Sequence, residues 1–350
     1  MSTYILDSTR KILNDPELIS IRDARMKALT DFYADPNHPK TTQTVPVLCG
    51  DCTFRPGLFD KDGTLLPPEE WVAFSLNSIA QCAEIIRDES VFRPVCIEYY
   101  TYGVHYIDKL LGAELVFSGG QVYNNYLTTE VGELEYPDLD SHPLWIHSKA
   151  VLDAFLKADV KLPYFGLPTI ASALNIAVNL YGQDFLIAML EEPEAAKHDL
   201  SVITRLLCYI HSYYRDNLPP EQLQPVISAH RTQPIGCGQV CGCTTQLVSK
   251  ELYDEFIAPC DEAVLNVYPN PGMIHLCGGH TQHIETFRNM KSLHAVQLND
   301  RAAGDLKYYF EGLRDDQVIY LDPCKEMSAE EAMKITDGRR LVLSMPNRPV

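Results

Sequence analysis

The chain has 350 residues, and its 46% hydrophobic and 22% charged residues are typical of a folded protein with a large core, which excludes a disordered chain. The formal charge of −18 argues against binding to nucleic acid or to an anionic membrane surface, because both require a basic face. The first residues lack the pattern of a signal peptide, and no apolar run approaches the roughly 20 residues of a transmembrane helix, so we expect a cytoplasmic protein.

Short apolar runs bounded by Gly, Pro, Asp or Asn alternate with longer helical stretches, a pattern typical of βαβ units. A further run at 114–117 predicts an insertion strand or hairpin outside the main fold. The alternation predicts an α/β fold, a single (β/α)8 TIM barrel over residues 1–350 with an N-terminal helical extension and small insertions. The eight predicted barrel strands are 45–48, 95–98, 162–165, 226–228, 273–276, 295–298, 318–321 and 341–344.

Helix starts are marked by their usual residues. Pro67 and Pro68 stand before an acidic first turn, and Pro193 fits the first position of a long helix. Ser249 and Ser328 are predicted N-caps, because a serine hydroxyl accepts a hydrogen bond from the first turn of a helix.

The predicted strand ends are rich in Cys and His, and in a βα barrel the catalytic groups lie at these C-terminal ends. His275 and Cys277 stand at the end of the fifth strand; alternate strand residues point the same way, so the two side chains can converge on one ion. Zinc suits such a mixed set, and a catalytic zinc keeps three protein ligands and one open position. We predict Cys324 as the third ligand, with Asp300 as a further ligand or as the carboxylate that orients His275. The alternative is a hydrogen-bonded core histidine beside a packing cysteine.

Other cysteines form weaker patterns. The eleven cysteines, an odd number, indicate reduced thiols in place of a disulfide framework. The pair Cys49-x-x-Cys52 fits either a metal site or a redox pair. Cys237, Cys241 and Cys243 lie in a predicted glycine-rich loop, and their spacing matches no cluster motif, so an iron–sulfur site is an open alternative.

Several polar residues at the same strand ends are candidates for binding the substrate. Tyr99 and Tyr102 are expected at the mouth of the pocket, either as rim packing or as catalytic residues. His280 and His283 follow the zinc motif at a helix start, as caps or as substrate contacts.

Segments in a defined order resemble the uroporphyrinogen decarboxylase superfamily, and more narrowly its zinc-dependent methyltransferases that serve corrinoid proteins and coenzyme M. Residues 166–174 resemble the family's "G-P-x-T-x-A-S" segment, and 249–259 resemble its "S-x-x-x-Y-x-x-F-x-x-P" helix. Residues 275–278 resemble its "H-x-C-G" zinc motif. The resemblance covers nearly the whole chain and implies the TIM-barrel fold.

Two departures from the family pattern restrict the function. The decarboxylases carry an Arg-rich segment after the first strand, and in this chain Arg55 is the one arginine at that place. They also carry a late "G-H-G" histidine motif, which residues 344–347 of this chain lack. Decarboxylation of uroporphyrinogen is therefore not expected. The methyltransferases carry a late zinc-ligating Cys that is also missing, and Cys324 would have to replace it.

The resemblance implies a zinc-dependent methyltransferase that moves a methyl group between a donor and a thiol acceptor. The donor is either a corrinoid carried by a partner protein or a small methylated compound. His275, Cys277 and Cys324 would hold Zn2+, while Asp300, Tyr99 and Tyr102 would serve catalysis. The candidate substrate-binding residues are Arg55, His230, Arg231 and His280.

Two alternatives are open. One is a decarboxylase, lyase or tetrapyrrole-binding member of the superfamily in which Arg55, His230 and Arg231 bind anionic groups. The other is a different metal centre built from Cys49, Cys52, Cys237, Cys241 and Cys243. All of these use a small-molecule ligand, and neither nucleic acid nor a membrane is expected as a partner.

Overall fold

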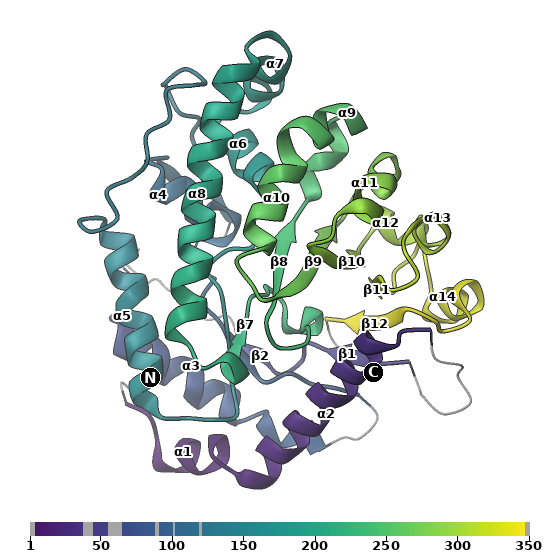
Figure 1. The fold of residues 1–350 in the computed structure, drawn as a ribbon. Coiled ribbons are helices and arrows are strands. Elements are labelled where there is room, and N and C mark those ends of the chain that lie inside the picture. The colour runs from purple at the N-terminus through teal and green to yellow at the C-terminus, as the bar shows by residue number, and fades with distance from the viewer. Residues whose placement is uncertain are drawn as a thin grey trace.

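The computed structural model describes residues 4–37, 45–54, 65–87, 91–100, 102–118 and 121–346. Helices α1 (Asp7–Leu13) and α2 (Pro16–Ala34) open the chain as the predicted N-terminal extension. Parallel strands lie at the centre of the molecule with helices around them (Figure 1). Among the described residues no single helix is long and apolar enough to cross a membrane; helices α6 (Ala173–Tyr181) and α7 (Gln183–Glu191) reach that length only as a pair bent by 109°.

The parallel strands form two sheets. The larger sheet has the order β1-β12-β11-β10-β9-β8, and the smaller has the order β2-β3-β6-β7. Isolated bridges join Ala171 to Cys241 and Leu48 to Phe92. The strands are β1 (Val47–Cys49), β2 (Thr53–Phe54), β3 (Cys96–Glu98), β6 (Tyr164–Gly166), β7 (Leu223–Gln224), β8 (Cys237–Cys241), β9 (Asn270–Leu276), β10 (Leu293–Leu298), β11 (Val318–Leu321) and β12 (Leu341–Met345).

The α/β class and the parallel strands are therefore confirmed. The described strands form two separate parallel sheets and not one closed barrel sheet. The prediction of a strand at 226–228 was wrong, because the strand there is β7 and Ser228 takes the left-handed φ of 78°. The predicted loop around 237–241 is strand β8. Gly238 allows this strand to pass under the ring of Tyr268, where a Cβ would lie only 2.4 Å from the ring.

Helices cover the outside of the strands, and their predicted starts are confirmed. Pro68 and Pro193 begin α3 and α8, and the hydroxyls of Ser249 and Ser328 cap α9 and α14. Helices α8 and α10 lie side by side against the sheet (Figure 1). The bounds are α3 (Pro68–Ala80), α4 (Tyr106–Leu110), α5 (Pro143–Ala158), α6 (Ala173–Tyr181), α7 (Gln183–Glu191), α8 (Pro193–Asn217), α9 (Lys250–Leu252), α10 (Ala258–Leu265), α11 (Ile284–Asn289), α12 (Arg301–Gly304), α13 (Leu306–Gly312) and α14 (Ala329–Thr336).

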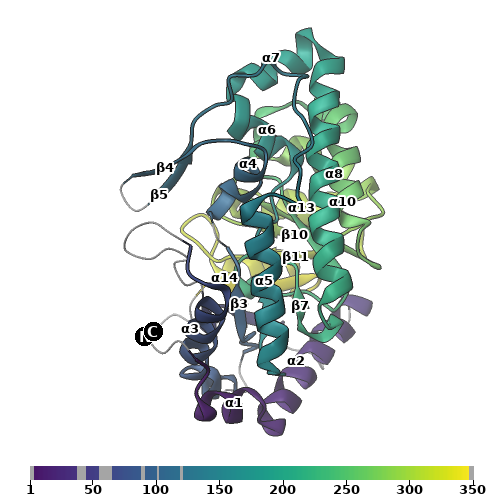
Figure 2. The same cartoon turned by 90° about the vertical axis from the view of Figure 1, so that its left-hand side faces the viewer.

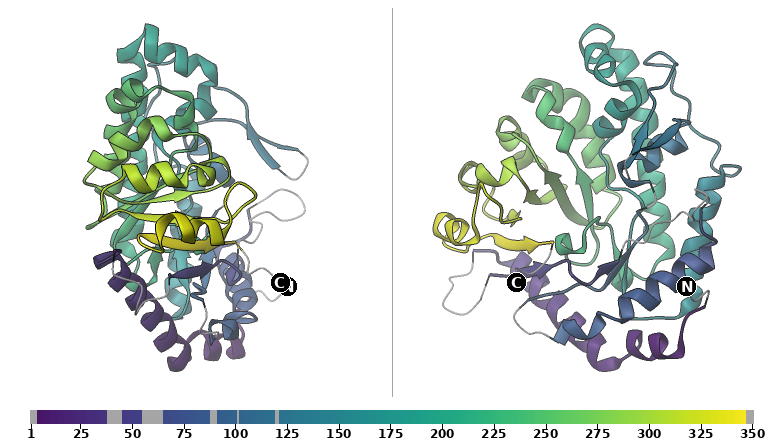
Figure 3. Two further views of the ribbon diagram at one scale, coloured as in Figure 1. Left: turned by 90° about the vertical axis from the view of Figure 1, so that its right-hand side faces the viewer. Right: turned by 180° about the vertical axis from the view of Figure 1, so that it is seen from behind.

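The predicted insertion at 114–117 is an antiparallel hairpin of β4 (Leu115–Ser118) and β5 (Gln121–Asn124). It belongs to neither of the two parallel sheets. The hairpin projects from the body of the molecule (Figures 2 and 3).

The strands enclose an apolar layer to which most of them give one side chain. Its members include Leu48, Cys96, Tyr164, Met273, Ala295, Tyr320 and Val342. Because side chains alternate along a strand, the residues two positions further on face the same way. Those residues include Glu98, His275, Gln297, Asp322 and Ser344, all of them buried and polar. The fold thus places a polar layer at the C-terminal ends of the strands, above an apolar one.

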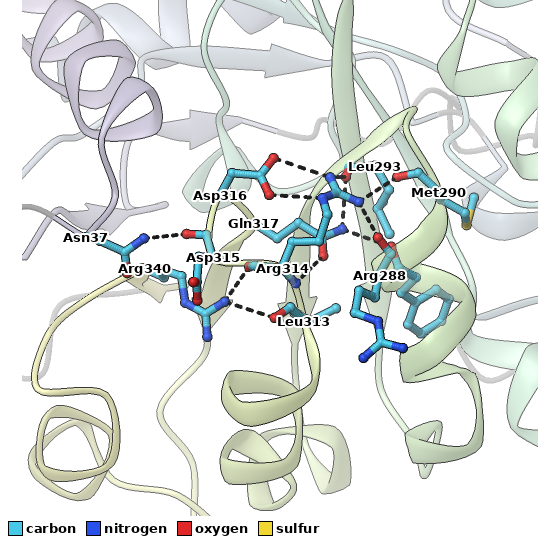
Figure 4. Close-up of polar contacts among 11 residues, drawn as sticks. Asn37, Arg288, Met290, Leu293, Leu313, Arg314, Asp315, Asp316, Gln317 and Arg340 are labelled. Carbon is cyan, nitrogen blue, oxygen red and sulfur yellow. Dashed lines mark hydrogen bonds and ion pairs between the residues drawn. The ribbon is translucent and has the colours of Figure 1, made fainter.

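Arg314 anchors the start of β10, the strand that carries Gln297 (Figure 4). Its guanidinium donates hydrogen bonds to the backbone carbonyls of Met290 at 3.1 Å and Leu293 at 3.0 Å. The Gln317 amide donates to the same Leu293 carbonyl at 3.0 Å. These bonds satisfy carbonyls at the end of α11 and hold the strand's entry point in place.

The spacing of β8 and β9 depends on Gly272, where an alanine Cβ would lie 2.3 Å from the carbonyl oxygen of Gly238. We expect Gly272→Ala to cost about 1–3 kcal/mol, because the backbone it meets cannot rotate away. In the control, Gly278→Ala, the new Cβ meets only the far end of the exposed Gln246 side chain, so the cost should stay below about 0.5 kcal/mol. Urea unfolding of both variants measures this, and equal losses would contradict the assignment.

Candidate metal centre

A cluster of thiols and one imidazole forms where β8 and β9 end. Cys241 is the last residue of β8 and lies opposite His275 in the register of the two strands. Cys243 begins the next turn, and the ligand atoms of Cys241, Cys243 and His275 all lie within 4.8 Å of one another. The Sγ atoms of Cys241 and Cys243 are 3.3 Å apart. Two sulfurs and one nitrogen are a donor set that suits zinc.

Cys277 adds a third thiol to this cluster. It follows β9 directly, and its thiol hydrogen-bonds with that of Cys243, which therefore lies between Cys241 and Cys277. The bond with Cys243 lowers the pKa of Cys241 to about 7, helped by the positive charge of Arg231. The bond with Cys243 also lowers the pKa of Cys277. Thiolates, the form that binds metal, are therefore favoured at the two outer positions.

His275 is oriented by a glutamine on the neighbouring strand. Its Nδ1 donates a hydrogen bond to Oε1 of Gln297, which lies opposite it in the β9–β10 register. This bond leaves Nε2 as the ring nitrogen that can accept a metal. Burial, and next the charge of Arg231, lower the pKa of His275 to about 3, so the ring is neutral at physiological pH. The residue predicted to orient His275 was Asp300, and in the structure Gln297 makes this contact.

The segment before α6 holds Cys241 from one side. The backbone N–H of Cys241 donates to the Ile170 carbonyl at 2.6 Å, and the Cys241 carbonyl accepts from Ser172 N–H at 3.2 Å. The Asn175 amide donates to Cys241 Sγ at 3.6 Å, and its oxygen accepts from Thr244 N–H at 3.3 Å. The segment 166–174, which carries part of the family resemblance, thus positions this thiol.

Two histidines hold the cysteine-bearing turn from the other side. His280 accepts a hydrogen bond from Gly278 N–H at Nε2 and lies 3.0 Å from the Thr245 hydroxyl at Nδ1. Nε2 of His283 donates to the Thr245 carbonyl at 2.9 Å. Both ring nitrogens of His280 are engaged, and the side chain is fully buried. Its role as a substrate contact stays a prediction, while its position ties Cys277 to the turn of Cys243.

Charged and polar residues form a second group within the same polar layer. His230 Nε2 lies 3.4 Å from a carboxylate oxygen of Asp322, whose other oxygen accepts from the Ser344 hydroxyl. Burial raises the pKa of Asp322, but its contact with His230 and the charge of Arg231 outweigh burial and lower it. The charge of Arg231 also lowers the pKa values of Cys241, Cys277 and His275, so Arg231 lies near the thiol cluster. No ion pair of Arg231 occurs within the described residues, and its Nε is buried without a hydrogen-bond partner there.

The turn that carries His230 and Arg231 depends on Glu98. Ser228 precedes them with φ 78°, a conformation that costs a non-glycine residue on the order of 1–3 kcal/mol. Its N–H donates to a carboxylate oxygen of Glu98 at 2.7 Å, and Glu98 is only 1% exposed. The carboxylate therefore compensates for the strained turn and sets the position of both side chains.

The remaining predicted site residues lie at varying distances from the cluster. Cys324 is half-buried, and its thiol donates to the backbone carbonyl of Asp300 at 3.7 Å; neither residue belongs to the group of close ligand atoms. The hydroxyl of Tyr99 is buried against Nδ1 of His147 at 2.9 Å. Tyr102 packs near Phe117 on the hairpin, with 6.3 Å between ring centroids. Arg55 lies outside the described residues.

Sequence reasoning placed Cys241 and Cys243 only in an alternative metal centre and did not combine them with His275. One signal was available: the pair Cys241-x-Cys243 has the same spacing as His275-x-Cys277, and both pairs begin within the last two residues of consecutive strands. Gln297 carried no signal of its own, because its importance comes only from lying opposite His275.

We expect Gln297→Leu to weaken zinc binding by about 10–100-fold, since the partner of a metal-bound histidine sets its orientation and basicity. Competition with a chromophoric chelator measures the affinity. Gln246→Leu, at an exposed position on the neighbouring turn, is the control and should leave the affinity unchanged. Equal affinities in wild type and Gln297→Leu would show that His275 is not a ligand.

Comparisons with known proteins support the fold. No family model and no curated protein matches the sequence, so the superfamily resemblance stays a prediction. A methyltransferase from Methanosarcina mazei matches the structure with a TM-score of 0.60 at 12% identity, covering 94% of each chain. A B12-independent methionine synthase from Shewanella sp. W3-18-1, solved with selenomethionine, matches with a TM-score of 0.48 at 9% identity over 87% of this chain and 91% of that one. The chain is therefore similar in fold to the Methanosarcina methyltransferase over nearly its whole length.

Proposed function

We propose that this protein is a zinc-dependent methyltransferase that delivers a methyl group to a thiol acceptor. The observation that carries the proposal is the group of Cys241, Cys243 and His275 at the C-terminal ends of neighbouring parallel strands, with Gln297 on the second nitrogen of the histidine. The strand ends are where βα-barrel enzymes place their chemistry. The fold shared with a methyltransferase supports the same class of reaction.

In this proposal His275, Cys241 and Cys243 hold the zinc, and Cys277 lies against Cys243 as a further thiol. A bound zinc would supply one property, the loss of the proton from an acceptor thiol that binds to it. Cys324, the third ligand predicted from the sequence, is the alternative to Cys241 and Cys243. The variants described in the Discussion distinguish the two ligand sets.

The second polar group binds the remainder of the substrate. Arg231 lies near the thiol cluster without an ion-pair partner among the described residues, so it would bind an anionic group of the acceptor. Asp322 orients the ring of His230 beside it. The methyl donor is either a corrinoid carried by a partner protein or a small methylated compound. A lyase or a tetrapyrrole-binding protein would leave the thiol cluster without a role, which makes these alternatives less favoured.

The proposal is tested by incubating the zinc-loaded protein with methylcobalamin, or with small methylated amines, sulfides and alcohols, and a panel of thiols that do and do not carry a carboxylate or sulfonate. We expect a methyl thioether, detected by mass spectrometry, that disappears in His275→Ala and persists in Cys208→Ser, a half-buried cysteine on α8. A zinc-loaded protein that methylates none of these thiols from any donor would contradict the proposal.

A further inference from the structure

A second pair of thiols lies apart from the metal centre. The Sγ atoms of Cys52 and Cys82 are 3.3 Å apart although the residues are separated by 30 positions in the chain. Cys52 lies in the turn between β1 and β2, and Cys82 follows the end of α3. Cys52 is fully buried, whereas Cys82 is partly exposed. The Cys82 thiol can therefore react with a small reagent, and the buried Cys52 thiol lies next to it.

This pair differs from the thiols of the metal centre in its surroundings. The group of close ligand atoms among the described residues contains neither Cys52 nor Cys82. Beside the pair lies an ion pair of Asp51 and Arg93, with 3.2 Å between the charged atoms, so the nearby carboxylate is already engaged. The sequence suggested Cys49 as the companion of Cys52, and in the structure the thiol that Cys52 contacts is that of Cys82.

We propose that Cys52 and Cys82 are a thiol–disulfide exchange site that is oxidised by small-molecule disulfides. The Cys82 thiolate attacks a sulfur of the small disulfide, forms a mixed disulfide and releases one small thiol. The Cys52 thiolate then attacks the Cys82 sulfur and releases the second small thiol. Two protein thiols are oxidised to one disulfide, one small disulfide is reduced to two thiols, and the two protons leave with those thiols.

The geometry and the acidity of the two groups support this order of events. The sulfurs must approach from 3.3 Å to about 2.05 Å, a movement within the reach of side-chain rotation. The hydrogen bond with Cys52 lowers the pKa of Cys82, so this partly exposed thiol is the better nucleophile. The bond with Cys82, together with burial, raises the pKa of Cys52 well above its ordinary value, so Cys52 reacts second.

The disulfide would join the β1–β2 turn to the end of α3, close to the candidate site. The same turn contains Gly50, which packs so closely on His230 that a Cβ there would lie 2.9 Å from Nδ1 of the ring. Gly50 N–H also donates to the Met345 carbonyl at 2.9 Å. Oxidation therefore restrains a turn that contacts His230, and it does so whether or not the protein transfers methyl groups.

The experiment treats the full-length reduced protein with oxidised glutathione and maps the alkylated peptides by mass spectrometry. We expect the eleven thiols to fall by two at this site, with one disulfide joining Cys52 and Cys82 that dithiothreitol reverses. Cys52→Ser should trap glutathione on Cys82, and Cys82→Ser should leave Cys52 unmodified. Cys324, which is half-buried and contacts a backbone carbonyl, is the internal control. It should form a mixed disulfide with glutathione or stay free, and it should not form a disulfide with another cysteine of the chain.

A wild-type protein in which Cys82 only carries glutathione, or in which both thiols stay free, would overturn the proposal. A disulfide that joins Cys52 to a cysteine other than Cys82 would overturn it as well. If Cys52→Ser fails to fold, the wild-type map and Cys82→Ser still decide the question. The readout is a peptide map, so it does not depend on metal loading or on any activity.

Discussion

Cys243→Ser is expected to reduce the zinc affinity of the protein by at least about a hundredfold, because even the partner of a ligand contributes about 10–100-fold. Cys243 is the central thiol of the cluster, in contact with Cys241 and hydrogen-bonded to Cys277. A serine hydroxyl preserves the size of the side chain but is a poor zinc donor. Competition with a chromophoric chelator, at constant pH, measures the change.

The matched control for this experiment is Cys324→Ser. Cys324 is also half-buried, but its thiol contacts the Asp300 carbonyl and not the cluster. We expect its zinc affinity to equal that of the wild type. The reverse pattern, with affinity lost in Cys324→Ser and kept in Cys243→Ser, would restore the ligand set predicted from the sequence and overturn the one assigned from the structure.

Asp261→Asn is expected to gain stability relative to the wild type as the pH rises from 4 to 8. Asp261 is 1% exposed, and burial raises its pKa to about 7 from the ordinary 3.8. Between these two values the unfolded chain has released the proton and the folded chain has kept it. The unfolded state therefore binds fewer protons, and the free energy of unfolding falls as the pH rises. The asparagine does not titrate, so the fall is absent in the variant.

The expected gain over this pH range is roughly 2–4 kcal/mol, from a shift of about three pKa units at 1.36 kcal/mol each. Urea unfolding at pH 4, 6 and 8 measures it as the difference between variant and wild type. Asp254→Asn, at a partly exposed position with a 2.7 Å ion pair to Lys250, is the control. Its free energy of unfolding should differ from that of the wild type by less than about 1 kcal/mol at each pH. A pH-independent difference for Asp261→Asn would show that this carboxyl is ionised in the folded protein.

Much of the fold could be predicted because parallel strands and their helices leave local signals. The run at 318–321 is β11 residue for residue, and Pro68 and Pro193 begin the predicted helices. The errors arose where tertiary contacts outweigh local pattern. Ser228 is held in an unusual conformation by a hydrogen bond to Glu98. Gly238 lies within a strand, where the ring of Tyr268 occupies the position that a Cβ would take.

The candidate site could be predicted only in part for a related reason. His275 and Cys277 were selected because both lie on one strand, where spacing alone decides which way side chains point. Cys241 and Gln297 come from the strands on either side, β8 and β10, and Cys243 comes from the turn after β8. Register between strands that are distant in sequence is set by packing, so no local pattern could show that Cys241 lies opposite His275.

The central claim is that thiolates from the end of β8 and from the turn after it, and an imidazole from β9, hold one zinc ion. X-ray absorption at the zinc edge, on protein purified without added metal or nickel affinity resin, tests it most directly together with the metal content. We predict about one zinc per chain with at least two sulfur donors and one imidazole nitrogen, and with a sulfur contribution that falls in Cys243→Ser. Protein without zinc, or zinc bound only by oxygen and nitrogen, would contradict the claim.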